Sequence, residues 1–117
     1  MPRPKKWRRI CSMPETKRFG PLDSCTEGAY IVMAVDEYEA IRLIDLEGMT
    51  QEECAQNMSV ARTTVQAIYE SARKKIARSL VEGIPLAIEG GEYTLCDGKG
   101  ERCGARGCRR RKGARAE

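Results

Sequence analysis

Several side chains in the middle of the chain have the chemistry to recognise base pairs in DNA. Arg62 could grip a guanine edge or a phosphate, and the amide of Gln66 can pair bidentately with adenine. Thr63 and Ala67 offer methyl groups to thymine. Glu70 could accept a hydrogen bond from the amino group of cytosine, but a solvated surface carboxylate is an equally good interpretation because phosphates repel it. The set is useful only if one helix presents it on one surface.

The sequence predicts such a helix over about residues 61–81. Apolar residues recur there in steps of three and four, and Gly83 and Pro85 end the pattern. The inward positions are Val65, Ile68, Ala72, Ile76 and Leu80. At 100° per residue, the opposite surface consists of Thr63, Ala67, Glu70 and Lys74, with Arg62, Gln66 and Ser71 beside them.

Two shorter helices are expected before the long one, and the first should span about residues 37–47. It follows the apolar, β-prone run 30–35, which predicts a buried strand. Asp36 is a candidate N-cap, with Glu39 three residues later in a capping-box pattern. Gly48 fits the end of the helix.

The second short helix is expected to start after Thr50. Thr50 and Glu53 form another capping box, and Met49 and Cys54 occupy the positions of a hydrophobic staple. The amides near Thr50 and Gln51, at the start of this helix, would favour a backbone phosphate. The inward positions are Cys54, Ala55 and Met58, and a tight turn follows over residues 57–60.

A short helix, a turn of three or four residues and a longer helix are typical of a helix-turn-helix. Val60 and Val65 should pack against Ala55 and Met58 and fix a steep angle between the two helices. That arrangement would leave the outer surface of the long helix free to enter a DNA major groove. Helix pairs of this size also occur as plain core hairpins, so the pattern alone leaves both interpretations open.

A β-hairpin is expected after the long helix. Residues 85–89 and 92–95 are β-prone, and Gly90 and Gly91 between them accept the positive φ of a two-residue turn. A lone hairpin is marginal, so it should pack on the helices or pair with the strand at 30–35. The expected fold is mainly α: a three-helix core with a helix-turn-helix, a short N-terminal strand, a C-terminal hairpin and flexible basic tails.

The chain divides into three predicted parts. Residues 1–29 form a basic, proline-rich arm without regular structure, because prolines and glycines interrupt any helix. Residues 30–95 form the helix-turn-helix domain. Residues 96–117 form a tail rich in Cys, Arg and Gly, which lacks the apolar content to build a core and is expected to be disordered.

Charge is unevenly distributed over the 117 residues, whose net charge is +4. The net charge is +6 over residues 1–18, −8 over 19–98 and +6 over 99–117. Cationic ends bind polyanions through counterion release, although they can also act only as solubilising tails. The cations expected to lie in a narrow minor groove are Arg3, Lys5, Lys6, Arg8 and Arg9. Trp7 is expected to anchor this arm by packing on the domain.

The first 95 residues resemble a family of small prokaryotic proteins, the domain of unknown function 134, which is predicted to bind DNA. The resemblance is carried by Met1-Pro-Arg-Pro, the Arg8-Arg9 pair, Phe19-Gly-Pro21, the run from Val35 to Leu43 and Gly90-Gly91. Residues 51–80 are also similar to region four of sigma factors, a helix-turn-helix that recognises promoter DNA. That similarity implies Arg62, Thr63, Thr64 and Gln66 as DNA-facing positions, but it is an analogy of fold and does not establish a sigma function.

Two positions depart from the usual helix-turn-helix pattern. Ser59 stands where the turn commonly has glycine, and Ala61 stands where Ser or Thr usually caps the second helix. A missing cap costs about 1 kcal/mol of local stability. Asn57 could compensate for it, and so could Ser59.

Six cysteines are many for a chain of this length, and the sequence starts without a secretory signal, so a reduced compartment is expected. Cys54 should be a small buried hydrophobe. Cys96, Cys103 and Cys108 could bind zinc or an iron–sulfur cluster, with Cys11 or Cys25 as a fourth ligand. The sequence has no Cys-x-x-Cys pair, which weakens this case, and simple redox reactivity of the thiols is another interpretation.

The expected function is sequence-specific binding of double-stranded DNA by a cytoplasmic transcriptional regulator that inserts helix 61–81 in the major groove. Homodimerisation through the hairpin or the strand at 30–35 would double the number of base pairs contacted. The alternatives are a metal- or redox-sensing regulator that uses the cysteine tail, and an RNA or protein interaction module. No run is long and apolar enough for a membrane span. Histidine is absent, and no paired carboxylates, phosphate loop or activated nucleophile stand out, so an enzyme is not expected.

Overall fold

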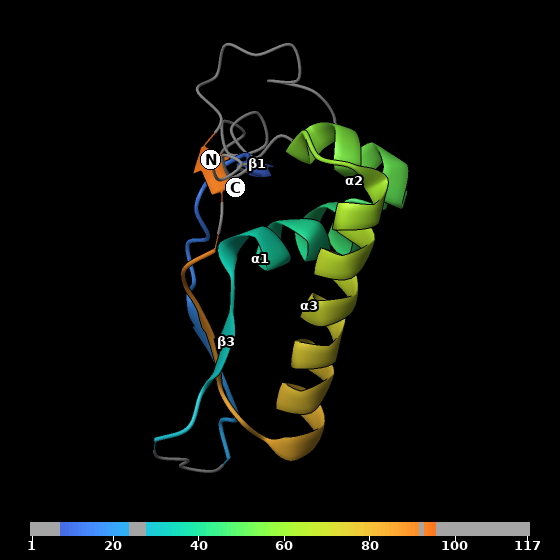
Figure 1. Ribbon diagram of the computed structural model, residues 1–117. Coiled ribbons are helices and arrows are strands. Elements are labelled where there is room, and N and C mark those ends of the chain that lie inside the picture. Colours follow the sequence, from blue (N-terminus) through green and yellow to red (C-terminus); the bar gives the residue numbers. More distant parts are fainter. Residues whose placement is uncertain (1–7, 24–27, 92, 96–117) are drawn as a thin grey trace, which may run out of the picture.

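The computed structural model of the chain describes residues 8–23, 28–91 and 93–95. Three α-helices and a π-helical segment lie beside short strands (Figure 1). The elements are β1 (Arg8–Ile10), β2 (Arg18–Phe19), β3 (Ile31–Met33), α1 (Val35–Ile41), the π-helical η1 (Arg42–Leu46), α2 (Gln51–Met58), α3 (Arg62–Glu82), β4 (Leu86–Ile88) and β5 (Tyr93–Leu95). A helical core with a few short strands is thus confirmed. None of the helices in these ranges has the length and apolar character to cross a membrane.

The strands form two small sheets. β4 is central in a sheet of three, antiparallel to β2 and parallel to β3, while β1 and β5 pair in parallel. The predicted hairpin is therefore wrong, because β4 and β5 belong to different sheets. The alternative pairing of residues 85–89 with the strand at 30–35 is confirmed, since Leu86 lies opposite Ile31.

The prediction that residues 1–29 have no regular structure is wrong at β1 and β2. Pro14 lies between these strands and Pro21 lies after the second, so neither proline removes a ladder hydrogen bond. Strands of two and three residues are also too short to show an alternating pattern in the sequence.

Helix α1 begins at Val35, two residues earlier than predicted, and the expected capping box of Asp36 and Glu39 is wrong. Ala34 is the N-cap, and its amide donates to Oε1 of Glu37 at 2.9 Å. The Val35 amide donates to the carbonyl of Gly90 at 2.9 Å, so the segment after β4 satisfies this helix end. The start of the helix is therefore fixed by this tertiary contact together with the local bond between Ala34 and Glu37.

The boundaries of α2 and α3 agree closely with the prediction. The capping box is present: the Glu53 amide donates to Oγ1 of Thr50 at 3.1 Å, and the Thr50 amide donates to Oε1 of Glu53 at 2.9 Å. Ser59 ends α2 with a left-handed φ of 60°, the conformation for which glycine is the usual residue. Ala61 precedes α3 and supplies no side-chain cap, as expected. Gly83, at a φ of 72°, ends α3.

Two apolar clusters hold these elements together. One joins α1, η1, α2 and the first half of α3 through Ala40, Leu43, Met49, Cys54, Ala55, Met58, Val65 and Ile68. The other joins the strands to α1 and the middle of α3 through Ile10, Ile31, Met33, Val35, Ala72, Leu86 and Ile88. Burial, followed by the nearby Glu39 carboxylate, raises the pKa of the Cys54 thiol to about 12, so this cysteine is a neutral core residue, as predicted.

The inward stripe of α3 ends earlier than predicted. Val65, Ile68 and Ala72 are buried and Ile76 is half-buried, but Leu80 is 82% exposed. Leu80 lies at the rim of an open groove between the last turns of α3 and residues 19–21, and the described residues leave most of its side chain in solvent.

Candidate nucleic-acid interface

No part of the chain that the structure describes covers the outer surface of α3. The side chains exposed there are Arg62, Thr63, Gln66, Ala67, Glu70, Ser71 and Lys74, the seven positions that helical geometry predicted. Thr64, which only the sigma-factor resemblance implied, is half-buried. Figure 1 shows α2 across the first turns of α3, with the strands beside its other end. The surface is therefore held by rigid elements and is not covered by them.

The seam between α2 and α3 sets the position of this surface. Ala55, Met58 and Val65 are all buried in one cluster, and the partly buried Val60 packs against it. The amide of Val60 donates to the carbonyl of Ala55 at 3.0 Å, which closes the turn. These contacts are the ones that the sequence predicted between the two helices.

Glu37 fixes α1 against α3, and sequence reasoning missed it. Its carboxylate accepts hydrogen bonds from the Ser71 hydroxyl at 2.6 Å and the Lys75 ammonium at 2.7 Å, in addition to the Ala34 amide. Burial acts to raise the pKa of Glu37, but these hydrogen bonds and the charge of Lys75 outweigh it, so the pKa lies below its usual value. Ser71 is exposed beside the outer surface, as expected, but its hydroxyl donates to Glu37.

A second interaction orders a cation that the sequence pattern did not single out. The Tyr69 hydroxyl donates to Oδ1 of Asp45 at 2.8 Å, and the guanidinium of Arg73 lies 5.4 Å from the centre of the Tyr69 ring. Arg73 is exposed and lies 11 residues after Arg62, on the same side of the helix, so it adds positive charge beside the outer surface. In the sequence, only the position of Arg73 on the helix indicates this role, and several other charged residues have similar positions.

The start of α2 differs from the expected phosphate site. Free amides were expected near Thr50 and Gln51, and of these the Thr50 amide donates to the Glu53 side chain in the capping box. Thr50 is exposed and Gln51 is half-buried. The carboxylates of Glu52 and Glu53 also lie in the first turn, so the local charge there is negative.

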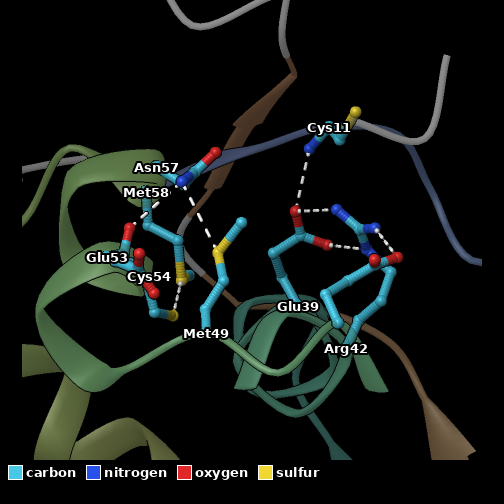
Figure 2. A network of polar contacts seen from close by, with 9 residues as sticks. Cys11, Glu39, Arg42, Met49, Glu53, Cys54, Asn57 and Met58 are labelled. Atoms are coloured by element: carbon cyan, nitrogen blue, oxygen red, sulfur yellow. Dashed lines mark hydrogen bonds and ion pairs between the residues drawn. The ribbon is translucent and has the colours of Figure 1, made fainter. Parts of the chain in front are cut away.

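A buried ionic network ties β1 to this helical core (Figure 2). Glu39 and Arg42 are 2% and 4% exposed, and their side chains meet in two hydrogen bonds of 2.9 and 3.0 Å. The amide of Cys11, next to β1, donates to Oε2 of Glu39 at 3.2 Å. The buried carboxylate of Glu39 is fixed by its pairing with Arg42. Because the Cys11 amide donates to this carboxylate, the end of β1 is held at a defined place on α1.

The N-terminal cations therefore divide into two groups. Arg8 and Arg9 lie in β1 and are half-buried, and the Arg8 guanidinium lies 3.8 Å from the carboxylate of Asp36. Arg8 is thus engaged with the domain and is not part of a free arm. The predicted positions Arg3, Lys5, Lys6 and Trp7 lie outside the described residues.

The structure offers no metal site among the residues it describes, where no group of three His, Cys, Asp or Glu side chains could hold an ion. Neither Cys11 nor Cys54, the cysteines in that part of the chain, is in a disulfide. The remaining cysteines of the zinc or iron–sulfur hypothesis, Cys25, Cys96, Cys103 and Cys108, lie outside it.

Known proteins similar to this chain carry names that state no activity. The family model "Protein of unknown function DUF134" matches residues 1–96. A UPF0251 protein of Desulfitobacterium hafniense (strain DSM 10664 / DCB-2) is 66% identical over 113 residues, which are 96% of this chain and 90% of the relative. UPF0251 proteins of Halothermothrix orenii and Clostridium botulinum (strain Loch Maree / Type A3) are 47% and 46% identical, each over 89% of this chain and over 79% and 68% of their own lengths. No solved structure matches the chain.

Proposed function

Because the chain belongs to the DUF134 family, whose description leaves the activity open, we propose a function from its geometry: sequence-specific binding of double-stranded DNA. In this proposal α2 and α3 form a helix-turn-helix, α3 enters the major groove, and the protein acts as a transcriptional regulator. The similarity of residues 51–80 to region four of sigma factors supports the assignment of the DNA-reading element.

One observation carries the proposal: the outer surface of α3 is exposed along its first four turns while α2 is packed across the helix behind it. Any helix at a protein surface leaves one face in solvent, so what favours DNA binding is that this face carries side chains able to contact base edges. Here Arg62, Thr63 and Gln66 occupy the first two turns of α3, which is where recognition helices contact base edges.

Each exposed side chain has a role that follows from groove chemistry. Arg62 donates to a guanine edge or a phosphate, and Gln66 pairs with adenine. Thr63 and Ala67 contact the methyl group of thymine. Lys74 and Arg73 lie further along the helix and neutralise phosphates at the groove edge.

Glu70 restricts how the helix can lie in the groove. Its carboxylate is exposed between Ala67 and Lys74 on the outer surface, where phosphates would repel it. It is tolerated if it faces the floor of the groove and accepts from a cytosine amino group. This placement makes the proposal more specific, because Glu70→Gln should then change the base preferred at one position and not the overall affinity.

The direct test is selection of bound sequences from a random duplex pool by the full-length protein at about physiological salt. An enriched site supports the proposal, and Arg62→Ala and Gln66→Ala should each relax the preference at one base pair. Removal of a bidentate interaction with a base costs about 1 to 3 kcal/mol, which is roughly a 5- to 150-fold decrease in discrimination at that position.

The matched control is Arg78→Ala, which removes a cation from the same helix. Arg78 is exposed near the end of α3 and pairs with Glu82 at 3.3 Å. This variant should keep the selected sequence. A pool that shows no enrichment, or equal binding of single-stranded RNA of any sequence, would show that the proposed function is wrong.

A further inference from the structure

An apolar surface lies at the end of α3 opposite the proposed DNA-reading turns, and we call it the distal patch. It consists of Phe19, Leu22 and Leu80, which are 48%, 102% and 82% exposed. A groove of about 300 Å³ lies between the last turns of α3 and residues 19–21, and Ile76 and Leu86 form part of its lining. In Figure 1 this is the end of α3 farthest from α2.

The shape of the distal patch fits a second copy of the same chain. A two-fold interface uses the same surface on both partners, so that surface must contain both projecting side chains and a hollow to receive them. The distal patch has both: Leu22 and Leu80 project into solvent, and the groove lies directly beside Leu80. Each copy can therefore place an apolar side chain in the groove of the other.

The direction in which the distal patch faces also fits a dimer that binds DNA, and this step rests on the proposed function. At 100° per residue, Leu80 is turned about 110° from the mean direction of Thr63, Ala67, Glu70 and Lys74. If two copies meet through Leu80, their outer surfaces remain uncovered and can both face the same side, along the two-fold axis. An interface through the outer surfaces themselves would turn them toward each other and away from DNA.

The length of α3 fits the spacing of half-sites. Leu80 is 14 residues from Gln66, which is about 21 Å along a helix, so two copies joined near Leu80 can place their Gln66 residues up to about 42 Å apart. Half-sites one helical turn apart require about 34 Å, which lies within this range.

We infer that the distal patch is the self-association surface of this protein and that the chain forms a two-fold dimer through it. The test is sedimentation of the full chain over a range of concentrations, without DNA and with reductant present so that disulfides do not link the copies. Leu80→Ser and Leu22→Ser should each weaken the dimer about 100-fold, because both copies lose a buried leucine. Leu46→Ser is the control, since Leu46 is 76% exposed outside the patch.

The outcomes separate this inference from the proposed function. Weaker association of either patch variant with an unchanged circular dichroism spectrum, while Leu46→Ser sediments like the wild type, supports the inference, even if the protein selects no DNA sequence. A wild-type chain that stays monomeric at every concentration overturns it and leaves the patch to a different partner. A dimer that is insensitive to both patch substitutions also overturns it.

Discussion

Glu37 shows how one buried carboxylate can determine the stability of the helical core. It is 8% exposed, and its charged carboxylate accepts hydrogen bonds from the Ser71 hydroxyl and the Lys75 ammonium of α3. Because its pKa is lower in the folded protein than in the unfolded chain, its contribution is complete above the unfolded value, near 4.5, and is lost as the pH falls through the folded value. The stabilisation by Glu37 is therefore present at neutral pH and disappears in acid.

We predict that Glu37→Gln lowers the free energy of unfolding at pH 7 by about 1.5 to 3 kcal/mol, the usual range for hydrogen bonds to a charged group. At pH 3 the difference between variant and wild type should be much smaller, since protonation removes the same charge. Urea unfolding at the two pH values measures both quantities. Glu70→Gln, an exposed carboxylate on α3, should be nearly neutral, and a deficit for Glu37→Gln that is equal at both pH values would contradict the ionic explanation.

The individual residues that could be predicted are those whose role depends on neighbours in sequence. Thr50 and Glu53 cap α2 as expected, and Cys54 is buried as the stripe implied. Glu37 was missed and Leu80 was misjudged because their environments come from distant segments. Glu37 meets side chains 34 and 38 residues away, and Leu80 is exposed because residues 19–21 and Leu86 form an open groove beside it and do not cover it.

At the scale of elements, the start of α3 carries a correctable defect. Ala61 has the extended backbone of an N-cap, with φ −72° and ψ 153°, but it has no side-chain oxygen to satisfy the first amides of the helix. We predict that Ala61→Ser raises the free energy of unfolding by about 1 kcal/mol. Thermal and urea denaturation measure this change.

The control for this cap prediction is Ala77→Ser, the same substitution at an exposed position inside α3. There serine can only lose helix propensity, so stability should fall by a few tenths of a kcal/mol, about 0.5 at most. Equal effects at both positions would show that the cap is satisfied by another group. The sequence prediction of an uncapped helix would then be wrong in its energetic consequence.

The helices could be predicted from the sequence, and the strands largely could not. The apolar repeat of α3 extends over many residues, and Gly83 marks the end of this helix. The Thr50 capping box marks the start of α2. Strands of two or three residues have no comparable pattern, and their pairing is decided by contacts across the chain. Gly90 and Gly91 indicated a hairpin turn, yet Gly90 accepts from Val35, and a β-carbon on Gly91 would lie 2.7 Å from Asp36. Gly91 therefore serves the close approach to α1, whereas Gly90 supplies a positive φ of 76°.

For the whole molecule, the uneven charge and the proposed binding surface contribute different parts of DNA binding. The region from 19 to 98 carries a net charge of −8, whereas residues 99–117 carry +6. An acidic body gains little from non-specific attraction to phosphates, so the cationic ends should supply that affinity while α3 supplies the sequence preference. A deletion meant to test the N-terminal cations must stop before Arg8, because Arg8–Ile10 form β1.

We therefore predict that replacing the eight Lys and Arg residues of 99–117 by Gln weakens affinity and leaves sequence preference unchanged. The slope of the logarithm of the binding constant against the logarithm of salt concentration should become shallower by about 0.9 for each phosphate that the protein no longer neutralises. The ratio of binding to the selected site and to a mutated site should be unchanged. Titrations at several salt concentrations measure both, and a version with the same 19 residues scrambled serves as the control because it keeps the charge. If preference fell together with the slope, base recognition would depend on the tail, and the assignment of specificity to α3 would have to be abandoned.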